Sequence, residues 1–466
     1  MNLEIKIKKK VKKMLFSLTN PEVAILMMGI FLFAVLLGFP IAFTLMAMGI
    51  GFGYYAYYDA TMMEHIFDNR IFQLFVQNTY TVMDNNVLTA VPLFLFMGYL
   101  VERAGIVAKL FFAIRLASHR LPASMAVAAL VTCALFSTAT GIIGAVVTLM
   151  GLLAWPAMIR AGYDKKFASG VICSGGCLGI LIPPSIMLIV YAVIAQLSPL
   201  RLFAAAIFPG LMLAGLYILY VIIRAYLNPS LAPKPAAEEI PPRAEILKEV
   251  LVSFVPLFSL IILVLGTILG GLATPAEAAA VGAFGALVLS YFYKSLKWKN
   301  FKESVFLTAK TSAMIMWLFV GSWTFASVFS YLGGHEVFEQ FFKSMDIQPW
   351  QFLVITQIII FLLGWPLEWT EILIIFVPIF LPLVEFFGVN PYFFAMLIAL
   401  NLQTSFLTPP MAMSAYYLKG VQSKNVELMQ IFSGIMPFLA IVIFAMVLMY
   451  IFPGIALWLP DTLFAE

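Results

Sequence analysis

The sequence has little charge. Of its 466 residues only 11% are Asp, Glu, Lys or Arg, whereas 63% are hydrophobic and the mean hydropathy is +1.02. A soluble domain carries about 25% charged residues. Because so few charges cannot cover a soluble surface, we predict an all-α polytopic membrane protein. The same shortage argues against a cytosolic enzyme, and no nucleic-acid partner is expected.

Cysteine and histidine are scarce as well. Cys133, Cys173 and Cys177 lie in apolar runs, where we interpret them as packing residues rather than as metal ligands or a disulfide. The three histidines are scattered, and none lies inside a clear apolar span. The sequence also lacks a glycine-rich phosphate loop. These absences argue against an ATPase and an intramembrane enzyme, so we predict no enzymatic activity and no cofactor.

Apolar runs of about 20 residues, the length that crosses the hydrocarbon of a bilayer, recur along the chain. They lie near 22–38, 40–58, 86–102, 123–160, 167–195, 203–226, 250–272, 274–293, 312–332, 351–386, 392–418 and 428–452. Two of them are too long for one span and carry polar interruptions, at 137–141 and 364–371. Each predicts a re-entrant hairpin, whose non-helical tip must be buried in protein or line a wet cavity.

The proline-rich, charged segment 227–248 divides the chain into halves that resemble each other. A shift of 226 residues aligns nine identical residues in the 36 positions 156–191, including Pro183 with Pro409 and Pro184 with Pro410. About three identities are expected by chance. We predict a basic N-terminal tail over 1–21, repeat 1 over 22–226, a cytoplasmic linker over 227–248, repeat 2 over 249–455 and a C-terminal tail over 456–466. The hairpins span 123–160 and 351–386.

Basic residues indicate that the repeats are inverted. Three of them follow the first hairpin at 160–166, whereas the equivalent stretch 385–391 has none. After the next span the bias is reversed, with Arg201 in repeat 1 and Lys419 and Lys424 in repeat 2. This pattern predicts that 160–166, the linker, 294–310 and 419–424 lie in the cytoplasm. The side of the N-terminal tail stays open, because its six lysines conflict with this arrangement.

Each repeat contains a second interrupted helix, over 167–195 and over 392–418. In the first, Gly175, Gly176 and the Pro183–Pro184 pair loosen the backbone and remove N–H donors, so carbonyls lose their helical partners. In the second, amides and hydroxyls are dense over 401–408. Such oxygens suit a hard cation such as Na⁺, and half-helix N-termini suit a carboxylate. A packed proline kink is the alternative for either break.

Two carboxylates interrupt the second hairpin. Glu368 and Glu371 are three residues apart, so one helical face could carry both. A carboxylate at this depth is costly and typical of function, although a tip in interfacial water is the alternative. Glu277 has a simpler explanation, because 274–277 is a capping box at a helix start. Candidates for substrate binding or coupling are Ser137, Ser185, Glu368, Glu371, Asn401 and Ser405.

Three spaced segments, Gly-Ile-Leu-Ile-Pro-Pro-Ser at 179–185, Ala-Thr-Pro-Ala-Glu-Ala-Ala-Ala-Val-Gly at 273–282 and Asn-Leu-Gln-Thr-Ser-Phe-Leu-Thr-Pro-Pro at 401–410, resemble a known family. It is the large membrane (M) subunit of tripartite ATP-independent periplasmic (TRAP) transporters, and the mannitol/chloroaromatic branch is most similar. The resemblance covers about 22–455. It implies an inverted-repeat, elevator-type, Na⁺-coupled importer of small organic acids in the bacterial inner membrane. The implied partners are a small four-helix membrane (Q) subunit and a periplasmic substrate-binding protein.

The resemblance also implies two sodium sites, each formed by a hairpin and a broken helix. Site 1 would use Thr138, Thr140, Gly141, Ile142, Gly175, Leu178 and Ile180. Site 2 would use Gly364, Thr370, Thr404 and Thr408. Some family members have Ser-x-Ser at the first tip. In this sequence the aligned residues are Thr140 and Ile142, which provide only one hydroxyl, so backbone oxygens are expected to be the main ligands of the ion. A stand-alone dicarboxylate symporter and an ion channel remain the competing interpretations.

Overall fold

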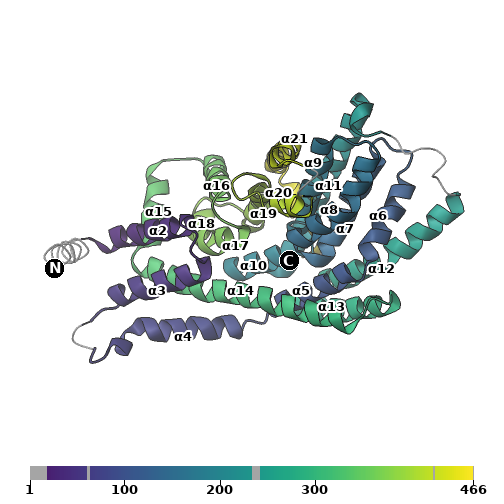
Figure 1. Ribbon diagram of the computed structural model, residues 1–466. Helices are drawn as coiled ribbons and strands as arrows, with labels where there is room; N and C mark the ends of the chain where they lie inside the picture. The colour runs from purple at the N-terminus through teal and green to yellow at the C-terminus, as the bar shows by residue number, and fades with distance from the viewer. Residues whose placement is uncertain (1–17, 60–62, 234–241, 423–425, 465–466) are drawn as a thin grey trace, which may run out of the picture. The chain divides into compact units, whose positions relative to one another are not determined.

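The protein is helical throughout the part that its computed structural model describes, residues 18–59, 63–233, 242–422 and 426–464 (Figure 1). Seven helical stretches there are long and apolar enough to span a membrane. They are α8 (Ile143–Arg160), α11 (Pro199–Leu227), α12 (Arg243–Leu269), α13 (Pro275–Phe292), α14 (Trp298–Tyr331), α21 (Leu428–Ile451) and Trp369–Phe386. The fold is therefore a polytopic all-α membrane protein, as the composition predicts.

One membrane span is sharply bent. Helices α5 (Ala90–Arg103) and α6 (Ile106–Ala117) meet at a short break with a bend of 65°. Only the two together are long and apolar enough to form one membrane span. Gly105 lies in the break with φ of +68°, a left-handed conformation that a glycine adopts without a steric penalty. The sequence predicts α5 but not α6.

The chain forms two compact units. The first consists of Met1–Asn85, Ala313–Val354 and Glu371–Gly388, and the second of Asn86–Ser312, Ile355–Thr370 and Val389–Glu466. Apart from Glu371, all the candidate site residues belong to the second unit.

The first unit contains α2 (Asn20–Leu36), α3 (Ile41–Ala56), α4 (Arg70–Met83), the end of α14, α15 (Gly334–Ser344) and α18 (Val377–Phe386). Glycines let α3 approach its neighbours closely. A Cβ on Gly49 would lie 3.0 Å from Thr324 Cγ2, and one on Gly53 would lie 2.4 Å from Ile71 Cδ1. Helices α4 and α15 are amphipathic, so a search for apolar runs misses them.

A π-helix over Ile372–Phe376 precedes α18 in the same unit. Pro378 has no N–H to donate to the carbonyl of Ile374, four residues earlier. That carbonyl instead accepts a hydrogen bond from Ser322 Oγ at 3.0 Å. A side chain of α14 thus replaces the missing backbone donor.

The second unit is held together by close contacts at small residues. Helices α9 (Lys165–Cys177) and α21 are in contact. A Cβ on Gly170 would lie 2.1 Å from the Gly434 carbonyl oxygen. A Cβ on Gly434 would lie 1.9 Å from the Lys166 carbonyl oxygen. Only glycine permits such a backbone approach. Helix α13 begins with the expected capping box, in which the Thr274 N–H donates to Glu277 Oε2 at 2.8 Å.

Two predicted boundaries differ from the observed helices. Helix α12 starts at Arg243, within the predicted linker. The expected C-terminal tail 456–466 lies largely in α22 (Gly454–Leu463), which packs on α11. Most of the predicted basic tail, residues 1–17, lies outside the described residues, and α2 begins at Asn20.

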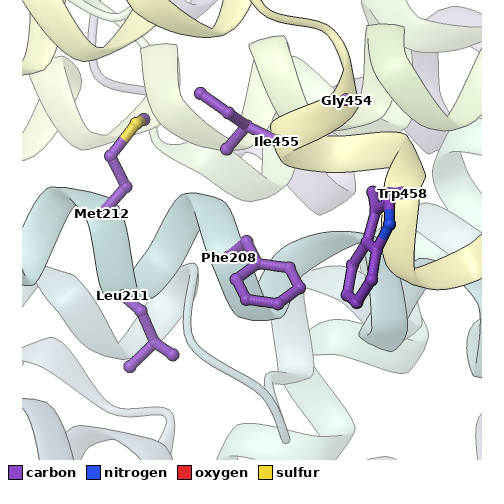
Figure 2. Close-up of a pocket in the computed structure, with 6 residues that line it drawn as sticks. All are labelled: Phe208, Leu211, Met212, Gly454, Ile455 and Trp458. Atoms are coloured by element: carbon purple, nitrogen blue, oxygen red, sulfur yellow. The ribbon is translucent and has the colours of Figure 1, made fainter.

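Helix α22 lies beside α11, and Phe208 of α11 faces Trp458 of α22, with ring centroids 5.6 Å apart (Figure 2). These rings and their apolar neighbours line a groove of about 680 Å³. One face of α22, which includes the buried Ala456 and Pro460, thus packs within the second unit.

Candidate functional site

The first predicted tip joins two helices that contact each other, α7 (Ser124–Thr140) and α8. Gly141 ends α7 in the left-handed conformation, with φ of +62°, and its N–H donates to the Ser137 carbonyl at 2.7 Å. Ile142 is extended, and α8 starts at the next residue. Two residues thus connect the helices, because glycine adopts the required φ without strain.

The first predicted helix break follows α9. A 3₁₀ turn at Leu178–Ile180 leads into a non-helical segment that contains a cis Pro183–Pro184 bond, and α10 (Ile186–Ala195) resumes the helix. The Leu178 carbonyl accepts from the N–H groups of Leu181 and Ile182, both at 3.1 Å. Ser185 Oγ donates to the Ile180 carbonyl at 2.6 Å. The Ser185 hydroxyl and backbone N–H groups therefore donate hydrogen bonds to carbonyls at the break.

The first tip lies directly against this break. A Cβ on Gly179 would lie 2.4 Å from Ser137 Cβ, and one on Gly141 would lie 3.3 Å from Ile186 Cδ1. The tip also contacts α5, where a Cβ on Gly98 would lie 2.7 Å from Thr140 Cα. The structure therefore brings the residues at 137–141 together with those at 178–186.

Gly175 is placed differently from the other site 1 candidates. A Cβ on it would lie 3.1 Å from Cys133 Sγ and 3.2 Å from Leu130 Cδ2, on the α7 turns that precede the tip. Its carbonyl accepts from the Leu178 N–H. These contacts place Gly175 beside the shaft of the hairpin rather than at its tip.

Buried hydroxyls without partners occur at the first tip and in α9, the helix that leads to the first break. Ser137, Thr140 and Ser174 are at most 2% exposed, and none of their hydroxyls has a hydrogen-bond partner among the described residues. The Thr138 hydroxyl, in contrast, donates to the Ala134 carbonyl of its own helix. A buried polar group left unpaired costs about 1–3 kcal/mol. Oxygen atoms of this kind fit a small cation or a water as the missing partner.

The second tip lies against the second break in a similar way. Helix α16 (Pro349–Leu363) ends at Gly364, where a Cβ would lie 2.8 Å from Ser405 Cβ of α19 (Pro391–Leu407). Thr408 is extended, the Pro409–Pro410 bond is cis, and α20 (Met413–Val421) resumes the helix. Helix breaks thus occur at equivalent positions of the two predicted repeats.

Polar side chains of α19 form a chain of hydrogen bonds. Asn401 Nδ2 donates to the carbonyl and to Oε1 of Gln357, at 2.7 and 2.8 Å. Thr404 Oγ1 donates to the Asn401 carbonyl at 2.7 Å, and Thr408 Oγ1 donates to the Thr404 carbonyl at 2.8 Å. Ser405 Oγ donates to the Leu402 carbonyl at 2.8 Å. Each hydroxyl keeps its acceptor lone pairs, so it is still able to bind a cation.

The second site also contains unpaired groups, two of them on residues outside the predicted set. Both amide atoms of Gln403, Gln357 Nε2 and Thr370 Oγ1 are buried without a partner in the described part of the chain. Gln357 was missed, although a glutamine within the apolar run of α16 is the kind of signal that marks a polar site. Gln403 lies in the dense polar stretch 401–408, but it is not among the predicted site residues.

The two hairpin carboxylates are not equivalent. Glu368 is partly buried and precedes the short helix α17 (Trp369–Glu371), so the expected single helical face is not present. Glu371 is 5% exposed and belongs to the first unit, whereas Glu368 belongs to the second. The chain changes unit between them, which the local spacing of two acids does not reveal.

Comparison with known proteins adds independent evidence. The chain matches the family described as "Tripartite ATP-independent periplasmic transporter, DctM component" over residues 8–455. It is 28% identical to the C4-dicarboxylate TRAP transporter large permease protein DctM of Pseudomonas aeruginosa, covering 82% of this chain and 88% of that protein. It is 30% identical to the sialic acid TRAP transporter large permease protein SiaM of Vibrio cholerae, covering 81% and 87%.

A solved structure supports the same fold. The YdaH transporter of Alcanivorax borkumensis aligns with a TM-score of 0.57 and 16% identity, over 90% of this chain and 98% of that chain. The curated relatives are transport permeases rather than enzymes. Together with its apolar helices, they make this chain a multi-pass transport subunit of the bacterial inner membrane. The match over residues 8–455 shows that the chain belongs to the TRAP transporter family, as its DctM component, the large permease subunit.

Proposed function

We propose that this chain is the permease subunit of a Na⁺-coupled secondary transporter that imports a small organic acid. The relatives support an anionic substrate, since they are named for C4-dicarboxylates, sialic acid and isethionate. Family membership supports delivery of the substrate by a periplasmic binding protein. A small Q subunit is the proposed membrane partner, because this chain covers 59% of the isethionate permease of Oleidesulfovibrio alaskensis, whose name DctMQ joins both subunits.

One observation carries the sodium proposal: each hairpin tip lies against a helix break, and each of the two regions contains buried side-chain oxygens without partners among the described residues. Released carbonyls and helix ends are typical ligands for coupling ions in transporters. We assign Thr138, Thr140, Gly141, Ile142, Leu178 and Ile180 to the first sodium site, with Gly175 as its most distant member. We assign Gly364, Thr370, Thr404 and Thr408 to the second site, with Gln403 as an added candidate.

The proposed substrate contacts lie next to these ion sites. Ser137 lies at the first tip against the first break, and Ser185 lies in that break. Asn401 and Ser405 lie in α19, before the second break. The half-helices α10 and α20 begin immediately after the two breaks, so their N-termini would offer positive dipole ends to a carboxylate. Glu368 and Glu371 remain candidates for coupling. The proposed motion is elevator-like sliding, which inverted repeats support because they provide two equivalent states.

A stand-alone symporter of the same architecture is the second candidate. It would differ in one property, because the purified chain alone would then transport substrate without a Q subunit or a binding protein.

The sodium sites can be tested by the Na⁺ dependence of uptake into proteoliposomes that contain all three components. Thr140→Val and Thr408→Val each remove one hydroxyl oxygen, and we expect the half-saturating Na⁺ concentration to rise by about tenfold or more. Thr132→Val is the matched control, since Thr132 is another buried hydroxyl of α7 without a partner in the described structure. An unchanged Na⁺ dependence in both site variants would contradict the assignment.

A further inference from the structure

A pocket separate from the proposed transport sites lies where α5 ends and α14 begins, within the second unit. Its volume is about 500 Å³, and none of its residues belongs to the proposed ion or substrate sites. It is lined by Arg103, Lys299, Lys302, Glu303, Phe306 and Leu307. The proposed transport cycle gives this pocket no role.

The pocket carries excess positive charge. Its lining has three basic residues and one acid, a net charge of +2. Arg103 pairs with Glu303, which leaves the lysines to account for the excess. In the described part of the chain no ion pair is recorded for Lys299 or Lys302, and both are exposed. The Lys302 ammonium lies 5.7 Å from the Phe306 ring centroid. The pocket therefore favours an anion.

The backbone adds to this preference. Helix α14 starts at Trp298, so Lys299 and Lys302 lie in its first two turns. The N-terminus of a helix is the positive end of its dipole and presents N–H groups that have no partner within the helix. The lysines and the N-terminus of α14 thus both favour the binding of an anion.

Part of the pocket lining is apolar, namely Phe306 and Leu307. Phe306 is 63% exposed and follows the lysines by about one turn. Trp298 is 76% exposed and stacks on Phe301, with ring centroids 5.7 Å apart. An exposed tryptophan at the start of an apolar helix is typical of the level of the lipid headgroups. Positive charge at Lys299 and Lys302, followed along the helix by Phe306 and Leu307, matches the order of a phosphate and its acyl chains.

We propose that this pocket binds an anionic phospholipid, with its phosphate at Lys299 and Lys302 and an acyl chain along Phe306 and Leu307. Basic pockets between membrane helices on the cytoplasmic side bind such headgroups. The basic segment 294–310, which includes the first turns of α14, is the one that charge bias assigns to that side. A free phosphate would use the lysines alone, so the apolar wall favours the lipid.

The test is lipid binding to the purified full chain in detergent, measured by native mass spectrometry. Phosphatidylglycerol and phosphatidylcholine with identical acyl chains are compared. The double variant K299Q/K302Q should weaken binding of phosphatidylglycerol by about 30-fold, about fivefold for each lysine, and leave phosphatidylcholine unchanged. The control K294Q/K297Q removes two lysine charges from the same basic segment, 294–310, but outside the pocket. It should change the binding of phosphatidylglycerol by less than about twofold. Thermal unfolding without lipid confirms that both variants fold.

Two further arms separate the sources of the phosphate. Glycerol phosphate should not compete with phosphatidylglycerol at equal concentration. Phe306→Ala should weaken the binding of phosphatidylglycerol without changing any binding of glycerol phosphate. Equal binding of both lipids, equal loss in the two lysine variants, or effective competition by glycerol phosphate would overturn the proposal. Equal binding of both lipids would indicate adsorption through the acyl chains, equal loss in the two lysine variants would indicate unspecific surface charge, and competition by glycerol phosphate would indicate a soluble phosphate ligand.

Discussion

Replacing Gly179 by alanine should separate the first hairpin tip from the first helix break. The new Cβ would lie 2.4 Å from Ser137 Cβ, 2.9 Å from the Ser137 carbonyl oxygen and 3.0 Å from Ser137 Cα. Ordinary contacts begin at 3.4 Å, so the two segments must move apart by about 1 Å. Overpacking of this kind costs about 1–3 kcal/mol. Because the tip and the break together form the proposed first sodium site, the half-saturating Na⁺ concentration should also rise by about tenfold or more.

Two measurements check this prediction: thermal unfolding of the purified chain and the Na⁺ dependence of uptake in proteoliposomes. Gly215→Ala is the control, because a Cβ at Gly215 meets no atom within 4 Å and alanine raises helix propensity. Ser137→Gly removes the atom at 2.4 Å but leaves the carbonyl at 2.9 Å, so it should rescue Gly179→Ala only in part. Wild-type stability together with wild-type Na⁺ dependence in Gly179→Ala would refute the close packing of tip and break.

Three further predictions concern other parts of the chain. Thr274→Ala should lower the free energy of unfolding by about 1 kcal/mol and Thr274→Ser should not, since the hydroxyl caps α13; thermal unfolding decides. Burial lowers the pKa of His335, so the folded protein should lose stability as the pH falls through about 6.5, and His335→Gln should flatten this loss between about pH 7.5 and pH 5. The three cysteines are buried, so maleimide should label them only after denaturation, and rapid labelling of the native protein would contradict their packing role.

The helix breaks were predictable from sequence because glycine and proline act on the backbone itself. Helices α7 and α16 end next to Gly141 and Gly364, and both Pro-Pro pairs lie in non-helical segments between half-helices. The apolar runs likewise predicted most of the helices, since membrane spans must be continuous to satisfy their backbone.

Features that depend on side chains distant in sequence were not predictable. The partner of Asn401 is Gln357, 44 residues away, and only the packing of α19 on α16 brings them together. The π-helix needs Ser322 to serve the Ile374 carbonyl. Amphipathic α4 and α15 were missed because their apolar residues are spread over a face rather than a run.

Uptake driven by ion gradients tests the central claim most directly. Proteoliposomes would contain this chain with the proposed Q subunit, and the proposed binding protein would be outside. A radiolabelled organic acid bound by that protein would serve as substrate. We predict accumulation with an inward Na⁺ gradient, and none with an equal K⁺ gradient or without the binding protein. Accumulation driven by a proton gradient and indifferent to Na⁺ would contradict the sodium sites and direct attention to Glu368 and Glu371.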